Sequence, residues 1–232
     1  MASDDEPSWA PGSFLARIAP GERDRLLALG TTRRLPPGRQ LLVEGRRDTH
    51  VELLRRGHVK VTTAIGGVSR LLAIRLAGDI IGEYAAIAGA GRSATVTTCG
   101  EVVATVLQQA DFLHFLGRHP QVANELTATV GRRLQWANSR RSGFAAFPVH
   151  VRLAHALAEI AASCGEAVED GLRIAVELSQ TELATLVGAA EDTVHKALRT
   201  LRGRGLIRTG YRRITVVDLA ALRALADQAE VL

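Results

Sequence analysis

Residues 178–207, LSQTELATLVGAAEDTVHKALRTLRGRGLI, have the pattern of two helices joined by a tight turn. Ser179 and Glu182 are spaced as a capping box, in which each side chain satisfies a backbone N–H at a helix start. Gly188 suits the turn, because a residue without Cβ tolerates a positive φ. A second helix from about Glu191 has one apolar and one polar side. The segment therefore predicts a helix-turn-helix, whose second helix enters the major groove of DNA.

The charges around this segment also favour nucleic acid. Two short strands, about 206–208 and 213–217, flank TGYR and predict a wing whose arginines suit phosphates. A solvated basic face over an ordinary helical hairpin is the alternative interpretation. No acidic residue lies between Asp192 and Asp218, an interval that holds the basic residues Lys196, Arg199, Arg202, Arg204, Arg208, Arg212 and Arg213.

Upstream, residues 35–116 have the pattern of short strands separated by glycines. Val59, Val61 and Thr63 alternate with His58, Lys60 and Thr62, which is the period of a half-buried strand. Regular short strands of this kind predict a barrel or sandwich. Near the other end of the chain, residues 164–171 have the pattern of a loop, and a short strand follows them.

A helix is predicted between these zones, over about residues 121–144. Its apolar seam suits pairing with the same helix of a second chain, or packing against the chain's own strands, and periodicity does not choose between the two. Pro148 ends the helix and makes a plausible hinge. The seam consists of Leu126, Val130, Leu134 and Ala137.

The stretch GEYAAIAGAGRSATV, residues 82–96, places one acid and one arginine among small apolar residues. Glu83 and Arg92 either pair with each other at a corner of the strands or face a ligand. The small side chains leave room for backbone N–H groups to approach a phosphate.

The order of these patterns resembles the cyclic-AMP receptor (Crp/Fnr) family of bacterial transcription regulators, from about Phe14 to Leu219. GDIIGEYAAIAGAGRSATV resembles the family's phosphate-binding cassette, and RRLQWANSRRSGFAAFPVHVRLA resembles its dimer helix and hinge. The resemblance implies an α+β fold with an N-terminal cyclic-nucleotide-binding β-roll, a long dimerisation helix and a C-terminal winged helix-turn-helix. The expected boundaries are 1–12 for a disordered tail, 13–118 for the β-roll, 119–147 for the helix and hinge, and 148–232 for the DNA-binding domain.

The resemblance further implies how an effector binds. Arg92 meets the phosphate with its fork of donors, Glu83 accepts from the ribose 2′-hydroxyl, and Ser93 adds a hydroxyl. Arg133 reaches towards the phosphate or is a solvated arginine. Where cyclic-AMP sensors of the family read adenine with a Thr-Ser pair, this chain has Ala137 and Asn138, of which only the asparagine can hydrogen-bond a base. The expected effector contacts are Gly82, Glu83, Arg92, Ser93, Ala94, Arg133 and Asn138.

The DNA-reading helix departs from the family pattern at its start. The family commonly has Ser-Arg-Glu-Thr-Val where this chain has AEDTV, residues 190–194, so Glu191 replaces an arginine suited to guanine. Glu191 accepts from a cytosine N4 amine, or it complements the helix dipole together with Asp192. The expected DNA contacts are Ser179, Thr181, Glu191, Asp192, Thr193, Lys196, Arg199, Arg212 and Arg213.

Composition and local sequence patterns limit the classes of protein to which the chain can belong. A chain of 232 residues with 47% hydrophobic and 23% charged residues and a net charge of +5 is ordinary for a soluble globular protein. No apolar run approaches the ~20 residues of a membrane span, and the acidic N-terminus is no secretory signal, so a cytoplasmic location without membrane contact is expected. Cys99 and Cys164 are too few for an iron–sulfur cluster. Because nucleophile–base pairs, metal-ligand clusters and phosphate-binding loops are missing from the pattern, neither an enzyme nor a metal site is expected.

The sequence therefore predicts an effector-responsive transcription regulator that binds a two-fold symmetric DNA site as a homodimer. Its expected effector is a non-covalently bound cyclic nucleotide, cyclic AMP before cyclic GMP, and RNA polymerase is a further expected partner. The alternatives are a regulator of the same family that needs no cyclic nucleotide or senses another ligand, and an enzyme that acts on nucleotides.

Overall fold

The computed structural model describes residues 9–10 and 12–227, which form two compact units. The first unit comprises Met1–Thr63 and Ala73–Arg133, and the second comprises Ala64–Leu72 and Leu134–Leu232. Of the expected disordered tail, residues 1–8 and 11 lie outside the described part of the chain. Trp9 packs against the core of the first unit, and its indole Nε1 donates to the Arg55 carbonyl at 3.1 Å.

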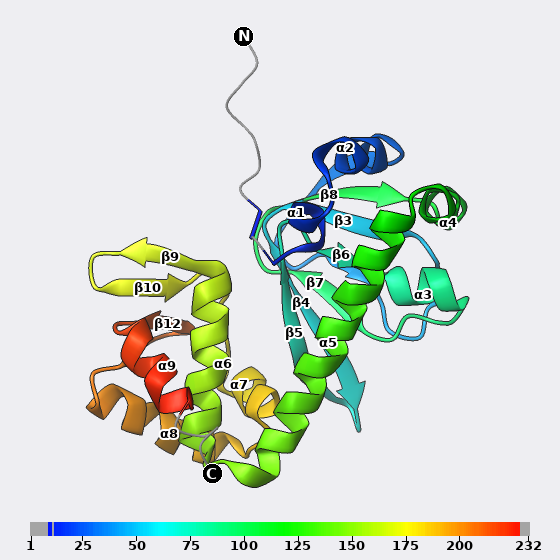
Figure 1. Cartoon of the computed structure of the whole chain (residues 1–232). Coiled ribbons are helices and arrows are strands. Elements are labelled where there is room, and N and C mark those ends of the chain that lie inside the picture. The colour runs from blue at the N-terminus through cyan, green and yellow to red at the C-terminus, as the bar shows by residue number, and fades with distance from the viewer. Residues whose placement is uncertain (1–8, 11, 228–232) are drawn as a thin grey trace. The chain divides into compact units, whose positions relative to one another are not determined.

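Two antiparallel sheets of four strands form a β-roll (Figure 1), and their orders are β1-β8-β3-β6 and β2-β7-β4-β5. Its residues belong to the first unit except for Ala64–Leu72, at the end of β4 and the start of β5. Large apolar side chains from both sheets fill the interior, among them the fully buried Leu53 and Leu54. The strands are β1 (Thr31–Leu35), β2 (Gln40–Leu42), β3 (Val51–Arg56), β4 (His58–Ile65), β5 (Val68–Leu76), β6 (Ile80–Ile81), β7 (Thr95–Thr98) and β8 (Val102–Leu107).

Short helices accompany these strands. Phe14 of the first helix and Phe112 of the fourth are fully buried in one core cluster together with Leu53 and Leu126. The helices are α1 (Phe14–Arg17), α2 (Pro20–Ala28), α3 (Glu83–Ala88), α4 (Gln109–Arg118) and the long α5 (Pro120–Ala146).

The apolar seam predicted on α5 does not form one uniform surface. Leu126 is 3% exposed and packs in the core of the first unit. Val130 and Leu134, one and two helical turns further on, are 42% and 61% exposed. Each of the two alternatives left open by the periodicity thus applies to a different part of α5. The first part packs on the chain's own β-roll, and the later part presents apolar side chains to the surface.

The second unit contains the helix-turn-helix. Ser179 Oγ accepts from Glu182 N at 3.1 Å, and Glu182 Oε2 accepts from Ser179 N at 2.8 Å, so the predicted capping box is formed. Gly188 follows in the left-handed region with a φ of 62°. The helices are α6 (Val149–Cys164), α7 (Gln180–Val187), α8 (Glu191–Gly203) and α9 (Leu219–Asp227).

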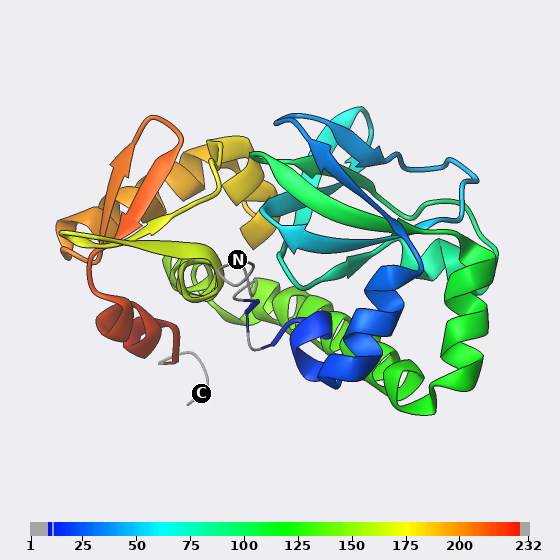
Figure 2. The same cartoon turned by 90° about the horizontal axis from the view of Figure 1, so that it is seen from above.

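One sheet completes this unit, with the order β11-β12-β10-β9 (Figure 2). Its strands β11 (Ile207–Gly210) and β12 (Arg213–Val216) form the predicted wing. The expectation of a loop at residues 164–171 is wrong, because β9 (Gly165–Val168) pairs there with β10 (Gly171–Ile174). Among the residues that the structure describes, no helix is long and apolar enough to cross a membrane.

Candidate functional site

The turn between β6 and α3 organises the candidate effector site. Gly82 occupies the N-cap position of α3 with a φ of 83°, in the left-handed region. A Cβ at this position would lie 2.6 Å from Arg92 Nη1 and 3.0 Å from the His50 carbonyl oxygen. Both the backbone conformation and the close approach therefore require glycine here.

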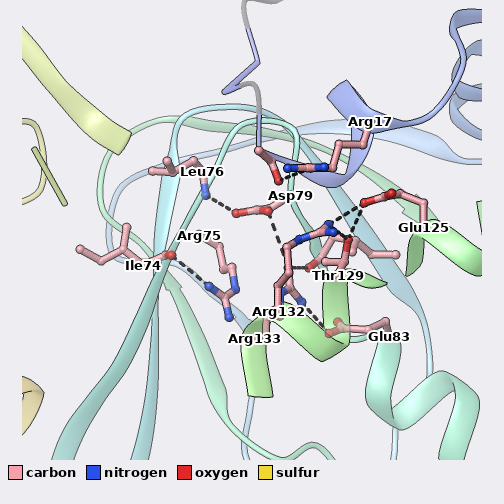
Figure 3. A network of polar contacts seen from close by, with 12 residues as sticks. Arg17, Ile74, Arg75, Leu76, Asp79, Glu83, Glu125, Thr129, Arg132 and Arg133 are labelled. Atoms are coloured by element: carbon pink, nitrogen blue, oxygen red, sulfur yellow. Dashed lines mark hydrogen bonds and ion pairs between the residues drawn. The ribbon is translucent and has the colours of Figure 1, made fainter. Parts of the chain in front are cut away.

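Glu83, the first residue of α3, contacts the long helix. Arg133 Nη1 donates to Glu83 Oε1 at 2.6 Å, and Arg133 Nη2 donates to the Ile80 carbonyl at 2.8 Å (Figure 3). Asp79 Oδ1 lies 3.7 Å from the same Nη2. In the described part of the chain Glu83 and Arg92 have separate partners, so the interpretation in which they pair with each other does not hold. Arg133 is not a solvated arginine, because its side chain is only 18% exposed.

Arg92 is buried on the other side of Gly82. Its Nε donates to Asp48 Oδ1 at 2.5 Å, and its Nη2 lies 2.5 Å from the same oxygen. Nη1 donates to the Gly82 carbonyl at 3.0 Å, and Nη2 donates to the His50 carbonyl at 2.7 Å. The guanidinium expected to meet a phosphate is thus surrounded by acceptors of the protein itself.

Sequence reasoning missed the acceptors at Asp48, His50 and Glu52. His50 Nε2 lies 3.2 Å from Glu52 Oε1, and Arg33 Nη2 donates to that same oxygen at 2.5 Å. Glu52 is fully buried in β3. The available signal was the spacing of two residues between these three side chains, which places them on one side of an extended segment.

Arg75 of β5 was also missed. In Figure 3 it lies beside Arg133, and its Nη1 donates to the Ile74 carbonyl at 3.4 Å. Among the described residues it forms no ion pair within 4.0 Å. Burial of the guanidinium, together with the nearby Arg133, lowers the pKa of Arg75 to about 10. Asp79 and Glu83 act in the opposite direction, so the half-buried cation of Arg75 is compensated only in part.

The remaining predicted effector residues lie as follows. Ser93 is exposed and Ala94 is half-buried, and both follow Arg92 in the loop before β7. Backbone hydrogen bonds hold this loop, because Arg92 N donates to the Arg46 carbonyl at 2.8 Å. Asn138 is exposed on α5, within the second unit.

The candidate DNA surface lies on α8 and the wing. Val194, Ala197, Leu198 and Leu201 are buried along one side of α8. The Ser179 hydroxyl accepts a hydrogen bond within the capping box, and Thr181 is half-buried. On the exposed side of α8 the structure places Glu191, Asp192, Thr193, Lys196 and Arg199.

The wing presents its arginines at its turn. Arg212 has a φ of 53°, which is unusual for a residue other than glycine, and its guanidinium lies over the ring of the exposed Tyr211. Arg213 is exposed at the start of β12. The Arg212 carbonyl accepts from Leu178 N at 3.2 Å, which fixes the wing turn to the residue before the N-cap of α7. The wing and the helix-turn-helix are therefore positioned by one another within the second unit.

Two family models match the two halves of this description. A cyclic nucleotide-binding domain covers residues 32–119, and a Crp-like helix-turn-helix domain covers residues 151–225. The chain belongs to the Crp/Fnr family of bacterial transcription regulators. It is therefore a DNA-binding transcription regulator, and it contains a cyclic nucleotide-binding domain.

Relatives of this Crp/Fnr chain match along most of its length. It is 28% identical over 210 residues to the cyclic AMP receptor protein of Thermus thermophilus, covering 90% of this chain and 94% of the relative. It is 29% identical over 184 residues to a CRP-like cAMP-activated global transcriptional regulator of Mycobacterium tuberculosis, covering 79% and 82%. The solved structure of a c-di-GMP-responsive global regulator of Xanthomonas campestris has a TM-score of 0.73 at 18% identity, covering 86% and 100%, and shows the shared fold.

Family membership and the α+β fold with an N-terminal cyclic-nucleotide-binding and a C-terminal helix-turn-helix domain are therefore confirmed for this Crp/Fnr protein. The roles assigned to single effector-binding and DNA-binding residues stay predictions, as do the domain boundaries.

Proposed function

We propose that the protein is a cytoplasmic homodimer whose β-roll binds a cyclic nucleotide and whose two α8 helices bind a two-fold symmetric DNA site. One observation carries the effector proposal. Glu83 and Arg92, the carboxylate and guanidinium that suit a ribose hydroxyl and a phosphate, flank a glycine whose backbone only fits without a side chain. Cyclic AMP is the first candidate, because the similar proteins of Thermus thermophilus and Mycobacterium tuberculosis are named for their response to cyclic AMP or their role as its receptor.

The DNA proposal rests on charge and exposure. Lys196 and Arg199 stand on the exposed side of α8, and Arg212 and Arg213 stand on the wing, so cations are available both for base edges and for phosphates. Exposed apolar residues support the dimer: Val130 and Leu134 follow each other at a spacing of four on α5. RNA polymerase remains an expected partner on the strength of the family alone.

A second candidate is a Crp/Fnr regulator that works without a cyclic nucleotide or with another ligand. The contact between Arg92 and Asp48 favours it, because the side of the guanidinium that a phosphate would use is already occupied. The replacement of the adenine-reading pair by Ala137 and Asn138 favours it as well.

Calorimetry of the full chain against cyclic AMP, cyclic GMP and a cyclic dinucleotide tests the effector proposal. We expect saturable binding of a cyclic mononucleotide that is weakened far more in Arg92→Ala than in the matched variant Ser93→Ala, because a charge-assisted contact outweighs a neutral one. Equal affinity in wild type and Arg92→Ala would reject the phosphate assignment. Absence of binding for all three ligands, with sequence-specific DNA binding intact, would establish the second candidate instead.

A further inference from the structure

The acceptors around Arg92 contact different edges of its guanidinium group. A guanidinium offers the edge formed by Nε and one Nη as a pair of parallel donors, and this edge matches a carboxylate or a phosphate. In this protein both atoms of that edge lie 2.5 Å from Asp48 Oδ1. The carboxylate thus takes the position at which an anionic ligand would make its strongest contact with Arg92.

The other acceptors of Arg92 belong to the framework. His50 contributes its carbonyl directly before β3, and Gly82 contributes its carbonyl at the start of α3. The side chain of Asp48 belongs to the loop between β2 and β3 and is 38% exposed, whereas the side chain of Arg92 is 1% exposed. Among the partners of Arg92, Asp48 is therefore the group that an anion arriving from solvent meets first and can replace.

We propose that Asp48 is an internal competitor for the effector, and that its carboxylate must leave Arg92 before a phosphate can bind there. This inference rests on the proposed role of Arg92 in effector binding. Asp48 then determines affinity: it keeps the buried guanidinium neutralised in the free protein, and it sets how much effector is needed to replace it. A buried charge without a partner is costly, so an exchange of one anion for another avoids a state in which Arg92 is uncompensated.

His50 keeps the guanidinium in place during this exchange. Arg92 Nη2 lies 3.2 Å from His50 Nδ1, and because arginine only donates, this nitrogen accepts. His50 Nε2 lies 3.2 Å from Glu52 Oε1, and His50 Nδ1 also lies 3.5 Å from Asp48 Oδ1. With the carbonyls of His50 and Gly82 added, Arg92 retains three protein acceptors when Asp48 is gone. Neutral substitutions of Asp48 are therefore expected to leave the guanidinium where it is.

The test is a calorimetric titration of the full-length protein with cyclic AMP for wild type, Asp48→Asn and Asp48→Ser. Removing the competing charge is expected to tighten binding by about fivefold or more in both neutral variants, given the strength of a charge pair near a protein surface. Glu101→Gln is the matched control, because it removes the same charge from an exposed pair with Arg34 at 3.8 Å and is expected to leave affinity unchanged.

The outcomes separate this inference from the proposed function. If wild type binds cyclic AMP and both neutral variants bind it equally or more weakly, Asp48 merely supports Arg92 and the competitor is ruled out, while the effector proposal stands. If wild type and all variants fail to bind cyclic AMP, this inference and the assignment of cyclic AMP as the effector are both overturned. Thermal unfolding of each variant confirms that a weaker affinity does not come from a loss of the fold.

Discussion

The guanidinium of Arg133 donates to Glu83 Oε1 at 2.6 Å and so joins the long helix α5 to the first turn of α3. The two side chains are 18% and 12% exposed, which limits screening of their attraction by water and salt. The predicted ribose-binding carboxylate is therefore also one of the groups through which the β-roll contacts α5.

A double-mutant cycle with Glu83→Gln and Arg133→Met should measure this attachment. We expect a coupling energy of about 1–3 kcal/mol in urea unfolding of the β-roll, because contacting charges at a largely buried site are not additive. The exposed pair Arg34–Glu101, at 3.8 Å, serves as the control and should give no more than about 0.5 kcal/mol. Equal coupling energies in the two cycles would show that the Glu83–Arg133 contact stabilises the protein no more than an exposed ion pair does.

Arg75 is expected to destabilise the fold at neutral pH, because its half-buried charge loses solvation and lies close to Arg133. Arg75→Met should raise the free energy of unfolding by about 1–2 kcal/mol, whereas Arg70→Met, at an exposed position of the same strand, should change it little. The pKa of Arg75 lies at about 10 in the folded protein, below its ordinary value. Above pH 10 the unfolded chain therefore holds this proton more tightly, and the advantage of Arg75→Met should shrink as pH rises. An advantage independent of pH would contradict this explanation.

Glu191 is exposed at the start of α8, where base edges are closest in a helix-turn-helix complex. If it accepts from a cytosine, Glu191→Ala should lose about 1–3 kcal/mol of discrimination at one base position in each half-site. Binding sites selected from random DNA with wild-type and variant protein provide the measurement. Identical consensus sequences would assign Glu191 to the helix dipole. Arg212→Ala is the contrasting variant, since loss of a phosphate contact should weaken specific and non-specific binding alike.

Leu134 is the residue with which to test the dimer. Leu134→Glu should produce a folded monomer in sedimentation experiments at micromolar concentration, because the side chain is 61% exposed within one chain and does not support its core. Leu113→Glu on α4, where the leucine is 40% exposed, should leave the oligomeric state unchanged. A wild-type protein that sediments as a monomer with and without effector would refute the proposed dimer.

The helix-turn-helix could be predicted in detail because its determinants are local. The capping box spans Ser179 to Glu182, and the turn depends on one glycine. The strand β9 was missed because its four residues, GEAV, form a short edge strand without apolar alternation. A periodic pattern such as that of α5 identifies an apolar side, but it does not say what covers each residue, and Leu126 and Leu134 have different environments.

The candidate site shows the same limit of sequence-based prediction, because its contacts could not be predicted. Glu83 and Arg92 were found by their contrast with small apolar neighbours. Their actual partners lie far away in sequence: Asp48 is 44 residues from Arg92, and Arg133 is 50 residues from Glu83. Such pairings depend on how the strands bring distant segments together, and a single sequence does not contain that information in readable form.

The carbonyls of Ile80 and Gly82 accept from Arg133 and Arg92 respectively, so a single residue, Ile81, separates the two attachments. Ile81 is itself paired with Glu52 in the sheet. Occupancy of Arg92 and attachment of α5 therefore act on the same short segment of backbone. An anion bound at Arg92 can change the strength with which α5 is attached by some factor. Thermodynamic reciprocity then requires that a partner that fixes α5 changes the affinity for that anion by the same factor.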